Sequence, residues 1–155
     1  MITLCPHCGC ELDKPPPRKL RSVPQHRRAF AMIRAAYDHW PEAHEFMPES
    51  EEHLRAWLIC KASYHTVQTI DLADTEPAAA VVMIAAAYAQ AGKWHFTKTS
   101  GTRLHVFAPK SMSFDAMPHH QACTLFDDIA EIIEADIDLR IDDIMPPVRE
   151  RRRTA

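Results

Sequence analysis

Glycine is scarce in this chain, and the scarcity excludes several classes of enzyme. Only three of the 155 residues are glycine, whereas phosphate-binding loops, dinucleotide-binding turns and nucleophile elbows need at least two glycines at fixed spacing. None of these motifs occurs, and neither does the H-E-x-x-H pattern of zinc hydrolases. His39, His44 and His53 do lie among acids, so a metal-dependent nuclease stays open as an alternative. We favour a binding role without catalysis.

Long apolar runs are also absent. The longest apolar-leaning stretch, Pro77–Ala91, is rich in alanine and too short to span a bilayer. The sequence does not begin with a basic segment followed by an apolar run, the pattern of a secretory signal. We therefore expect a cytoplasmic protein with no membrane association and no disulfide framework. With 46% hydrophobic and 25% charged residues, the chain has an ordinary composition for one globular domain.

Three of the five cysteines crowd into the first ten residues. Cys5 and Cys8 have the C-x-x-C spacing with which two thiolates grip one zinc ion. A closed site needs two more ligands, and no second C-x-x-C follows. We take Cys10, His7 and His26, or a second copy of the chain, as sources of the missing ligands. The sequence thus predicts a zinc knuckle with candidate ligands Cys5, Cys8, Cys10 and His7; the alternatives are an inert loop or a ribbon remnant.

Other cysteines and histidines receive plainer interpretations. Cys60 and Cys123 stand among apolar neighbours in helical patterns, so we expect them to be small buried hydrophobic residues. His119 and His120 open a predicted helix, and we interpret them as a surface pair. Neither cysteine has a neighbouring base that would mark it as a nucleophile.

Charge is distributed unevenly along the chain. Residues 1–40 carry seven Lys or Arg and three acids, residues 41–143 carry seven and seventeen, and residues 144–155 carry four and one. A basic front and a basic tail around an acidic middle suit a protein that meets a polyanion or an acidic partner. The same asymmetry is also compatible with a purely solubilising role.

Periodicity predicts an α+β domain over residues 18–145. Apolar residues at helical spacing predict about four helices packed with a small antiparallel sheet. Residues 1–17 form a Cys knuckle and Pro-rich spacer, and residues 146–155 form a basic tail that we expect to be disordered. Residues 137–145 fit either a closing strand or a helical extension. The expected helices are Pro24–Trp40, Glu51–Ala62, Thr75–Ala91 and His119–Asp136, and the expected strands are 64–72, 94–99 and 103–108.

The first predicted helix divides into an apolar face and a basic end. Phe30, Ile33, Ala36, Tyr37 and Trp40 recur at helical spacing and are predicted to face the core. Between Arg18 and Trp40, six cations precede the first acid, Asp38, and they gather where a loop enters the helix. Side chains and free backbone N–H groups can bind an anion together at such an end.

Two short segments resemble phage proteins. Residues 21–30, RSVPQHRRAF, resemble the R-S-x-x-Q-x-R-x-x-[FW] segment of the phage NinB family, also called Orf recombination mediators. Residues 110–114, KSMSF, followed by Met117 and a helix bearing Phe126, are similar to a related, uncharacterised phage family. In that family a K-S-[IM]-S-F segment also precedes the last helix.

The resemblance implies an α+β homodimer that binds single-stranded DNA and cooperates with the host single-strand-binding protein in recombination or replication, in the host cytoplasm. The chain differs from NinB proteins in its first residues, since those proteins begin with a β-rich segment where this chain has the Cys knuckle. Matching positions make Arg21, Gln25, Arg27, Lys110 and Ser111 candidate DNA contacts.

Charge and aromatic content add to these candidates. Single-strand binding needs a positive groove with aromatic faces on which bases stack. Phe30, Tyr37, Trp94 and Phe114 are possible stacking faces, although we expect each in the core. The competing hypothesis is a phage protein that binds and modulates a host protein, in an interaction or counter-defence role. The further phosphate contacts are Arg28 and the tail residues Arg151, Arg152 and Arg153.

Overall fold

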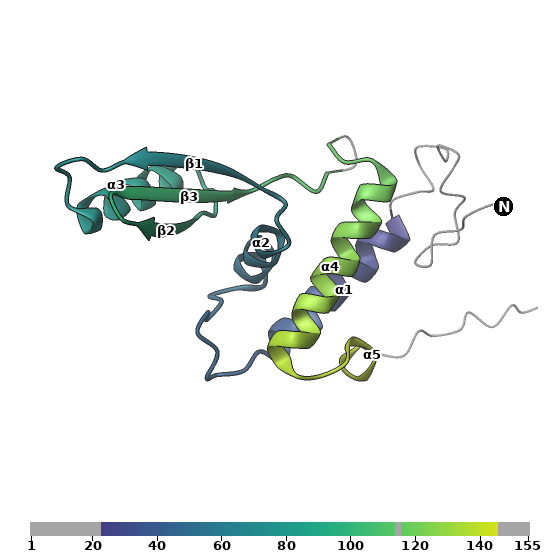
Figure 1. Ribbon diagram of the computed structural model, residues 1–155. Helices are drawn as coiled ribbons and strands as arrows, with labels where there is room; N and C mark the ends of the chain where they lie inside the picture. The colour runs from purple at the N-terminus through teal and green to yellow at the C-terminus, as the bar shows by residue number, and fades with distance from the viewer. Residues whose placement is uncertain (1–22, 114–115, 146–155) are drawn as a thin grey trace, which may run out of the picture.

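The computed structural model describes residues 23–113 and 116–145, with side chains from His26 onward, and confirms the α+β class (Figure 1). The four main helices and three strands lie close to the predicted segments. Residues 137–145 were predicted to be either a closing strand or a helical extension, and the structure shows helix. The backbone turns at Asp138 in a left-handed conformation (φ 55°) and a short helix follows. In chain order the elements are α1 (Val23–Asp38), α2 (Glu51–Lys61), β1 (His65–Asp71), α3 (Pro77–Gln90), β2 (Phe96–Ser100), β3 (Arg103–Pro109), α4 (His119–Ile137) and α5 (Ile141–Ile144).

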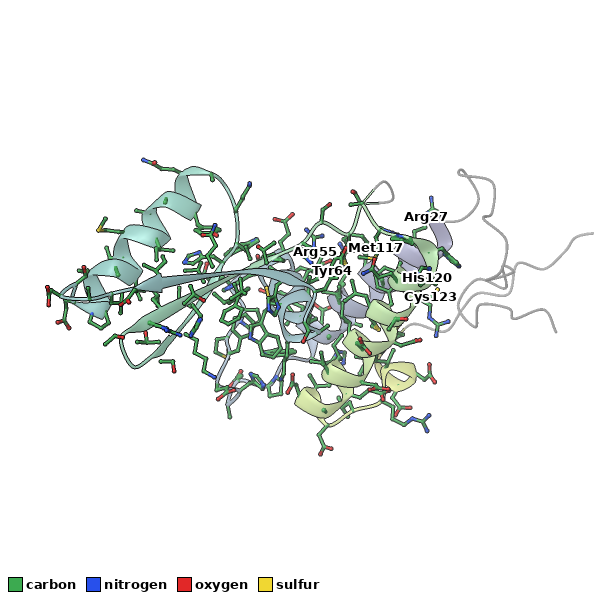
Figure 2. All side chains as sticks on the ribbon, turned by 45° about the horizontal axis from the view of Figure 1, so that its top comes forward. Arg27, Arg55, Tyr64, Met117, His120 and Cys123 are labelled. Atoms are coloured by element: carbon green, nitrogen blue, oxygen red, sulfur yellow. The ribbon has the colours of Figure 1, made fainter. Side chains whose placement is uncertain are left out.

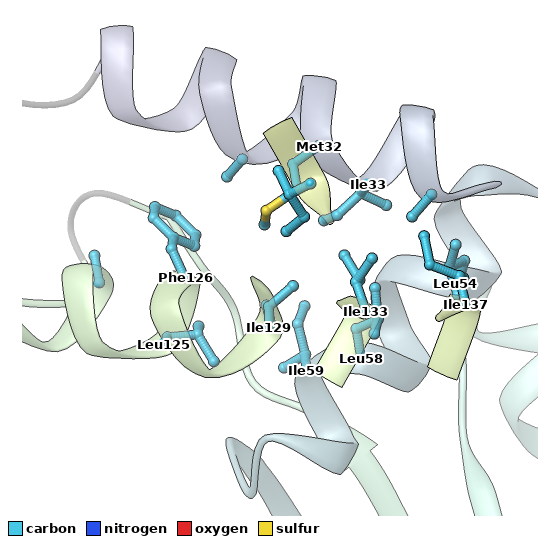
Figure 3. Packing of buried hydrophobic residues seen from close by; sticks show 14 of the residues in the cluster. Met32, Ile33, Leu54, Leu58, Ile59, Leu125, Phe126, Ile129, Ile133 and Ile137 are labelled. Carbon is cyan, nitrogen blue, oxygen red and sulfur yellow. The ribbon is translucent and has the colours of Figure 1, made fainter. Parts of the chain in front are cut away.

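Helices α1, α2, α4 and α5 form one part of the molecule, the helical lobe. Its core is a cluster of fifteen buried apolar residues among those described (Figure 3). Leu125, Ile129 and Ile133 recur every four residues on α4 and face Ile33 of α1 and Leu58 of α2. This cluster supplies most of the hydrophobic stabilisation.

The predicted core face of α1 is confirmed except at one residue. Ile33 and Ala36 are fully buried, and Tyr37 and Trp40 pack against the cluster while half-buried. Phe30 was predicted to join them, and this prediction is wrong because the residue is 36% exposed. α2 does not cover Phe30 where the two helices α1 and α2 cross, so the Phe30 ring borders a groove instead of the core.

The second part, the sheet lobe, consists of the three strands and α3. The strand order is β1-β3-β2 and both pairings are antiparallel. Leu104 and Val106 point from β3 toward α3 and are buried with Leu72. Phe107 follows Val106 in the strand and therefore lies on the opposite face, where it contacts His65.

Helix α3 covers one face of the sheet and leaves its own outer side uncovered. None of its residues is buried, and Val82 and Met83 are largely exposed. Within the described residues, no helix combines the length and hydropathy that a membrane span requires. The zinc-knuckle residues Cys5, His7, Cys8 and Cys10 lie outside the residues that the structure describes.

Candidate nucleic-acid interface

Two adjoining hollows meet at His26 and Phe30 of α1. The first, of about 820 Å³, runs along α1 and reaches Glu51 of α2. The second, of about 510 Å³, lies between α1, α2 and the segment 109–113 that follows β3. Because His26 and Phe30 line both hollows, we treat them as one surface and name it the Phe30 groove.

Phe30 presents an aromatic face to this groove. The Arg55 guanidinium carbon lies 5.0 Å from the centre of the Phe30 ring, within cation–π range. The His26 ring lies 6.1 Å from Phe30 and is tilted by 37°. A partly exposed aromatic ring beside a guanidinium group provides a surface on which a nucleic-acid base can stack.

Arg55 is a functional candidate that the sequence did not reveal. It lies on α2 next to the buried residue Leu54, and its side chain is half-buried. Only the crossing of α1 over α2 brings it to Phe30, so no local pattern could have identified it. The sequence signal, a lone arginine in a helix with acids in its first turn, is typical of an ordinary solvated helix face.

The groove brings together part of the predicted contact set. Arg27 lines the first hollow, while Lys110 and Ser111 line the second. Arg28 does not join them, since it lines a separate hollow of about 160 Å³ with Phe126 and other residues of α4 and α5. The side chain of Gln25, together with Arg21, Arg151, Arg152 and Arg153, lies outside the described residues.

The segment after β3 is held by local contacts. The Lys110 N–H donates to the Tyr64 carbonyl (3.1 Å), and the Lys110 ammonium lies 5.5 Å from the Tyr64 ring centre. The Ser113 N–H donates to Ser111 Oγ (3.1 Å). This bond uses the hydroxyl of Ser111 as an acceptor, and its proton can still be donated to a ligand.

Charge along the groove is mixed. Arg27, Arg55 and Lys110 supply positive charge, but Asp38 lines the first hollow and Glu52 lines the second. Arg34 is paired with Glu51 (Nε to Oε2, 3.1 Å) and both groups are partly exposed. Burial lowers the pKa of His26 below its ordinary value of 6.5, so its ring is neutral at pH 7. The positive charge in the groove therefore comes from arginine and lysine, and acidic side chains along the same groove offset much of it.

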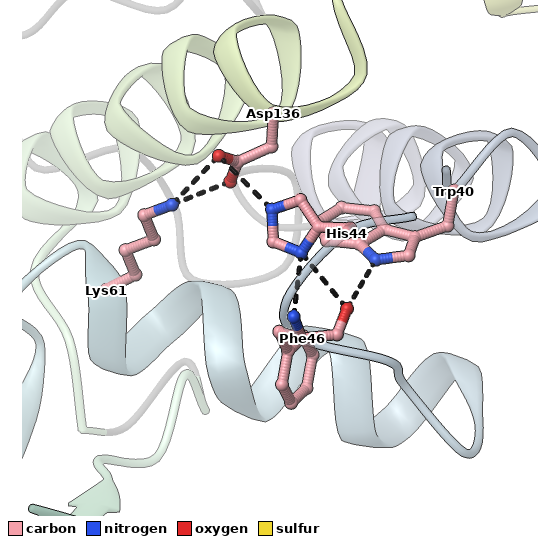
Figure 4. Close-up of polar contacts among 5 residues, drawn as sticks. All are labelled: Trp40, His44, Phe46, Lys61 and Asp136. Carbon is pink, nitrogen blue, oxygen red and sulfur yellow. Dashed lines mark hydrogen bonds and ion pairs between the residues drawn. The ribbon is translucent and has the colours of Figure 1, made fainter. Parts of the chain in front are cut away.

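The histidines considered for a nuclease hold the loop between α1 and α2. His39 Nδ1 donates to the Ala35 carbonyl (2.8 Å), and His53 Nδ1 accepts from the Glu49 N–H in the loop (3.2 Å). His44 accepts from the Phe46 N–H (3.0 Å), and its Nε2 lies 3.6 Å from Asp136 (Figure 4). In the part of the chain that the structure describes, no three His, Cys, Asp or Glu residues gather to hold a metal ion.

Asp136 joins α4 to α2 in the same region. Both of its carboxylate oxygens accept from the Lys61 ammonium, at 2.8 and 2.9 Å (Figure 4). The ammonium also lies 4.4 Å from the centre of the Trp57 ring. Trp40 donates through Nε1 to the Phe46 carbonyl (2.8 Å). Together with the contact of His44 to Asp136, these interactions hold the loop between α1 and α2 against α2 and α4.

No family model, curated protein or solved structure matches this chain.

Proposed function

We propose that this protein is a phage-encoded, non-catalytic accessory protein that binds single-stranded DNA in the Phe30 groove, as the resemblance to the NinB family implies. One observation carries the proposal. The two segments that bear the resemblance lie about eighty residues apart in sequence, and His26 and Phe30 from the first line the same groove as Lys110–Ser113 from the second. Homodimerisation and cooperation with the host single-strand-binding protein belong to the same proposal.

The chemistry of the groove suits a single strand. One base stacks on the open face of Phe30, beside the Arg55 guanidinium. Arg27, Arg55 and Lys110 contact phosphates on either side, and the Ser111 hydroxyl donates to another. Such contacts position the strand without reading its sequence, so we expect little base preference beyond stacking strength.

Salt dependence follows from the number of cations. Three phosphate contacts on a single strand give a slope of about −2 for log K against log salt concentration. Contacts from the tail arginines would steepen this slope. The neutral His26 contributes nothing to it near pH 7.

The test is fluorescence anisotropy with a labelled oligo-dT at low salt. Arg27→Ala combined with Lys110→Ala removes two cations from the groove, and we expect a loss of affinity of about tenfold or more with a shallower salt slope. Arg28→Ala combined with Lys98→Ala removes the same charge from a separate hollow and from exposed β2, and serves as the matched control.

Three outcomes would contradict the proposal. An equal loss in both double variants would indicate general charge attraction and not a groove. No binding of the wild-type chain at low salt would remove the DNA-binding function and favour a host protein as the partner. Cleavage of the oligonucleotide with Mg²⁺ or Mn²⁺ would make the protein a nuclease.

A further inference from the structure

The two edge strands of the sheet differ in how they are protected from pairing with a further strand. Strand β2 has five residues and carries Lys98 at its centre, a charge that discourages further pairing. Strand β1 has seven residues and neither lysine nor proline, and six of the seven are exposed. Val67 and Ile70 of β1 are 53% and 37% exposed, on opposite faces of the sheet. The edge of β1 therefore has the features of an interaction surface.

The outward-pointing backbone groups of β1 can be identified from its pairing with β3. The Leu72 N–H donates to the Thr102 carbonyl (2.8 Å), just beyond one end of the paired strands. The Lys110 N–H donates to the Tyr64 carbonyl, just beyond the other end. Because successive strand residues direct their backbone groups to opposite sides, the even-numbered residues of β1 bond to β3. The other residues direct N–H and C=O to the outer edge, along which no described strand pairs (Figure 1); they are His65, Val67, Thr69 and Asp71.

The sequence of β1 is self-complementary in one antiparallel register. When two copies pair about a two-fold axis through Gln68, all seven residues of each strand find a partner, and the outward-pointing residues bond to one another. His65 then lies opposite Asp71 of the second copy at both ends, so an imidazole faces a carboxylate and no like charges meet. Val67 lies opposite Thr69, and this pair covers the exposed valine. The complementarity favours a second copy of the chain as the partner.

We propose that β1 is the surface through which two copies of this chain pair, joining their sheets into one antiparallel sheet of six strands. The proposal rests on the proposed function in one respect, since it assigns a surface to the homodimerisation included there. Its evidence is the edge of β1 and not the resemblance.

The antiparallel register also places the two helical lobes. Figure 2 shows Tyr64, the residue before β1, beside the helical lobe, with the sheet extending away from it. In the dimer, the start of β1 in one copy lies beside the end of β1 in the other. These ends are about 20 Å apart along a strand of this length. The two Phe30 grooves therefore lie at opposite ends of the shared sheet.

Sedimentation velocity of the full chain without DNA tests the oligomeric state, and we expect a dimer at micromolar concentration. Val67→Pro removes an N–H that points to the outer edge and leaves the β1–β3 hydrogen bonds in place. The dissociation constant of the dimer should rise about tenfold or more, because each copy loses a hydrogen bond to the other. The matched control is Thr99→Pro on β2. Thr99 pairs with Leu104, whose backbone groups bond to β1, so the Thr99 N–H also points outward and its loss should leave the dimer unchanged.

A disulfide between the copies tests the register without removing any hydrogen bond. Gln68 lies on the proposed two-fold axis in a non-hydrogen-bonded pair, whose Cα atoms are about 4.5 Å apart, within the range of a disulfide. Gln68→Cys should therefore form a disulfide between two copies under oxidising conditions, identified as a cross-linked peptide by mass spectrometry. Thr69→Cys is the matched control, because the two copies of this position are diagonal neighbours about 7–8 Å apart, too far for a disulfide.

Several results would overturn the proposal. A wild-type chain that stays monomeric would remove the second copy as the partner and leave the edge of β1 to a strand of another protein. A dimer that Val67→Pro leaves unchanged, or a disulfide in Thr69→Cys with none in Gln68→Cys, would place the contact elsewhere. The DNA-binding function is judged separately, because these measurements contain no DNA. A monomer that binds oligo-dT would sink only the β1 proposal, and a β1 dimer without DNA binding would sink only the DNA-binding function.

Discussion

The helical lobe and the sheet lobe are both rich in apolar residues, but only one has a large core. Among the described residues, the four helices of the helical lobe converge on a cluster of fifteen buried residues, whereas the cluster of the sheet lobe has three. Helix α3 has no charged residue, and none of its residues is buried. Apolar composition therefore does not by itself make a core. What decides burial is how many elements face one another, and a three-stranded sheet with one helix offers a single interface.

The first prediction compares truncations in the two cores. Ile133→Ala in the helical lobe should lower the free energy of unfolding by about 3–5 kcal/mol, because Ile133 is fully buried in the larger cluster. Leu104→Ala, equally buried in the sheet lobe, should cost about 2 kcal/mol, because its small cluster can relax around the cavity. Urea denaturation of both variants measures the difference. Equal costs would show that the sheet lobe is as well packed as the helical lobe.

The second prediction concerns pH and involves both lobes. Burial lowers the pKa of His26 and His53 in the helical lobe and of His95, which stacks on Tyr88, in the sheet lobe. For His53, nearby Glu49 opposes part of this shift. Each unfolded imidazole binds a proton more tightly than the folded one, so these groups stabilise the fold fully above about pH 6.5 and destabilise it progressively as pH falls.

The melting temperature should therefore decrease as the pH is lowered from 7 to 5. Substitution of single histidines separates the contributions of the two lobes to this decrease. His53→Gln should flatten the dependence through the helical lobe, and His95→Gln through the sheet lobe. A pH dependence that neither substitution changes would assign the effect to the carboxylates.

Much of the fold was predictable from sequence because it follows from local periodicity. The spacing of Leu125, Ile129 and Ile133 is typical of the helix found at α4. The two predicted strands 94–99 and 103–108 pair as β2 and β3 on either side of a turn at Gly101, whose φ is +58°. The errors occurred where burial depends on distant elements. Phe30 continues the apolar face of α1 but lies where α2 does not cover it.

The candidate site was predictable only in part, for the same reason. Arg27 and Lys110 were found from their segments, and their shared groove required the tertiary structure. Arg55 carries no sequence signal by itself, since a single arginine on a helix is normally a solvated residue. His119 was expected at the surface together with His120, and this expectation is wrong for His119, which the fold buries while His120 is exposed.

The smallest expected effect concerns the outer side of α3. Val82→Ser and Met83→Ser should each change the free energy of unfolding by no more than about 0.5 kcal/mol, because both side chains are largely exposed. Urea denaturation of each purified variant measures the change in the free energy of unfolding. A loss of 2 kcal/mol or more would reveal that another surface covers α3 in solution.

The position of bound DNA is the most direct test of the central proposal. Ultraviolet cross-linking to an oligo-dT, followed by tryptic digestion and mass spectrometry, should yield modified peptide 29–34, which contains Phe30. Phe30→Ala should abolish this cross-link while leaving the chain folded, because the residue is 36% exposed. Cross-links confined to the sheet lobe, or an unchanged pattern in Phe30→Ala, would contradict the Phe30 groove as the binding site.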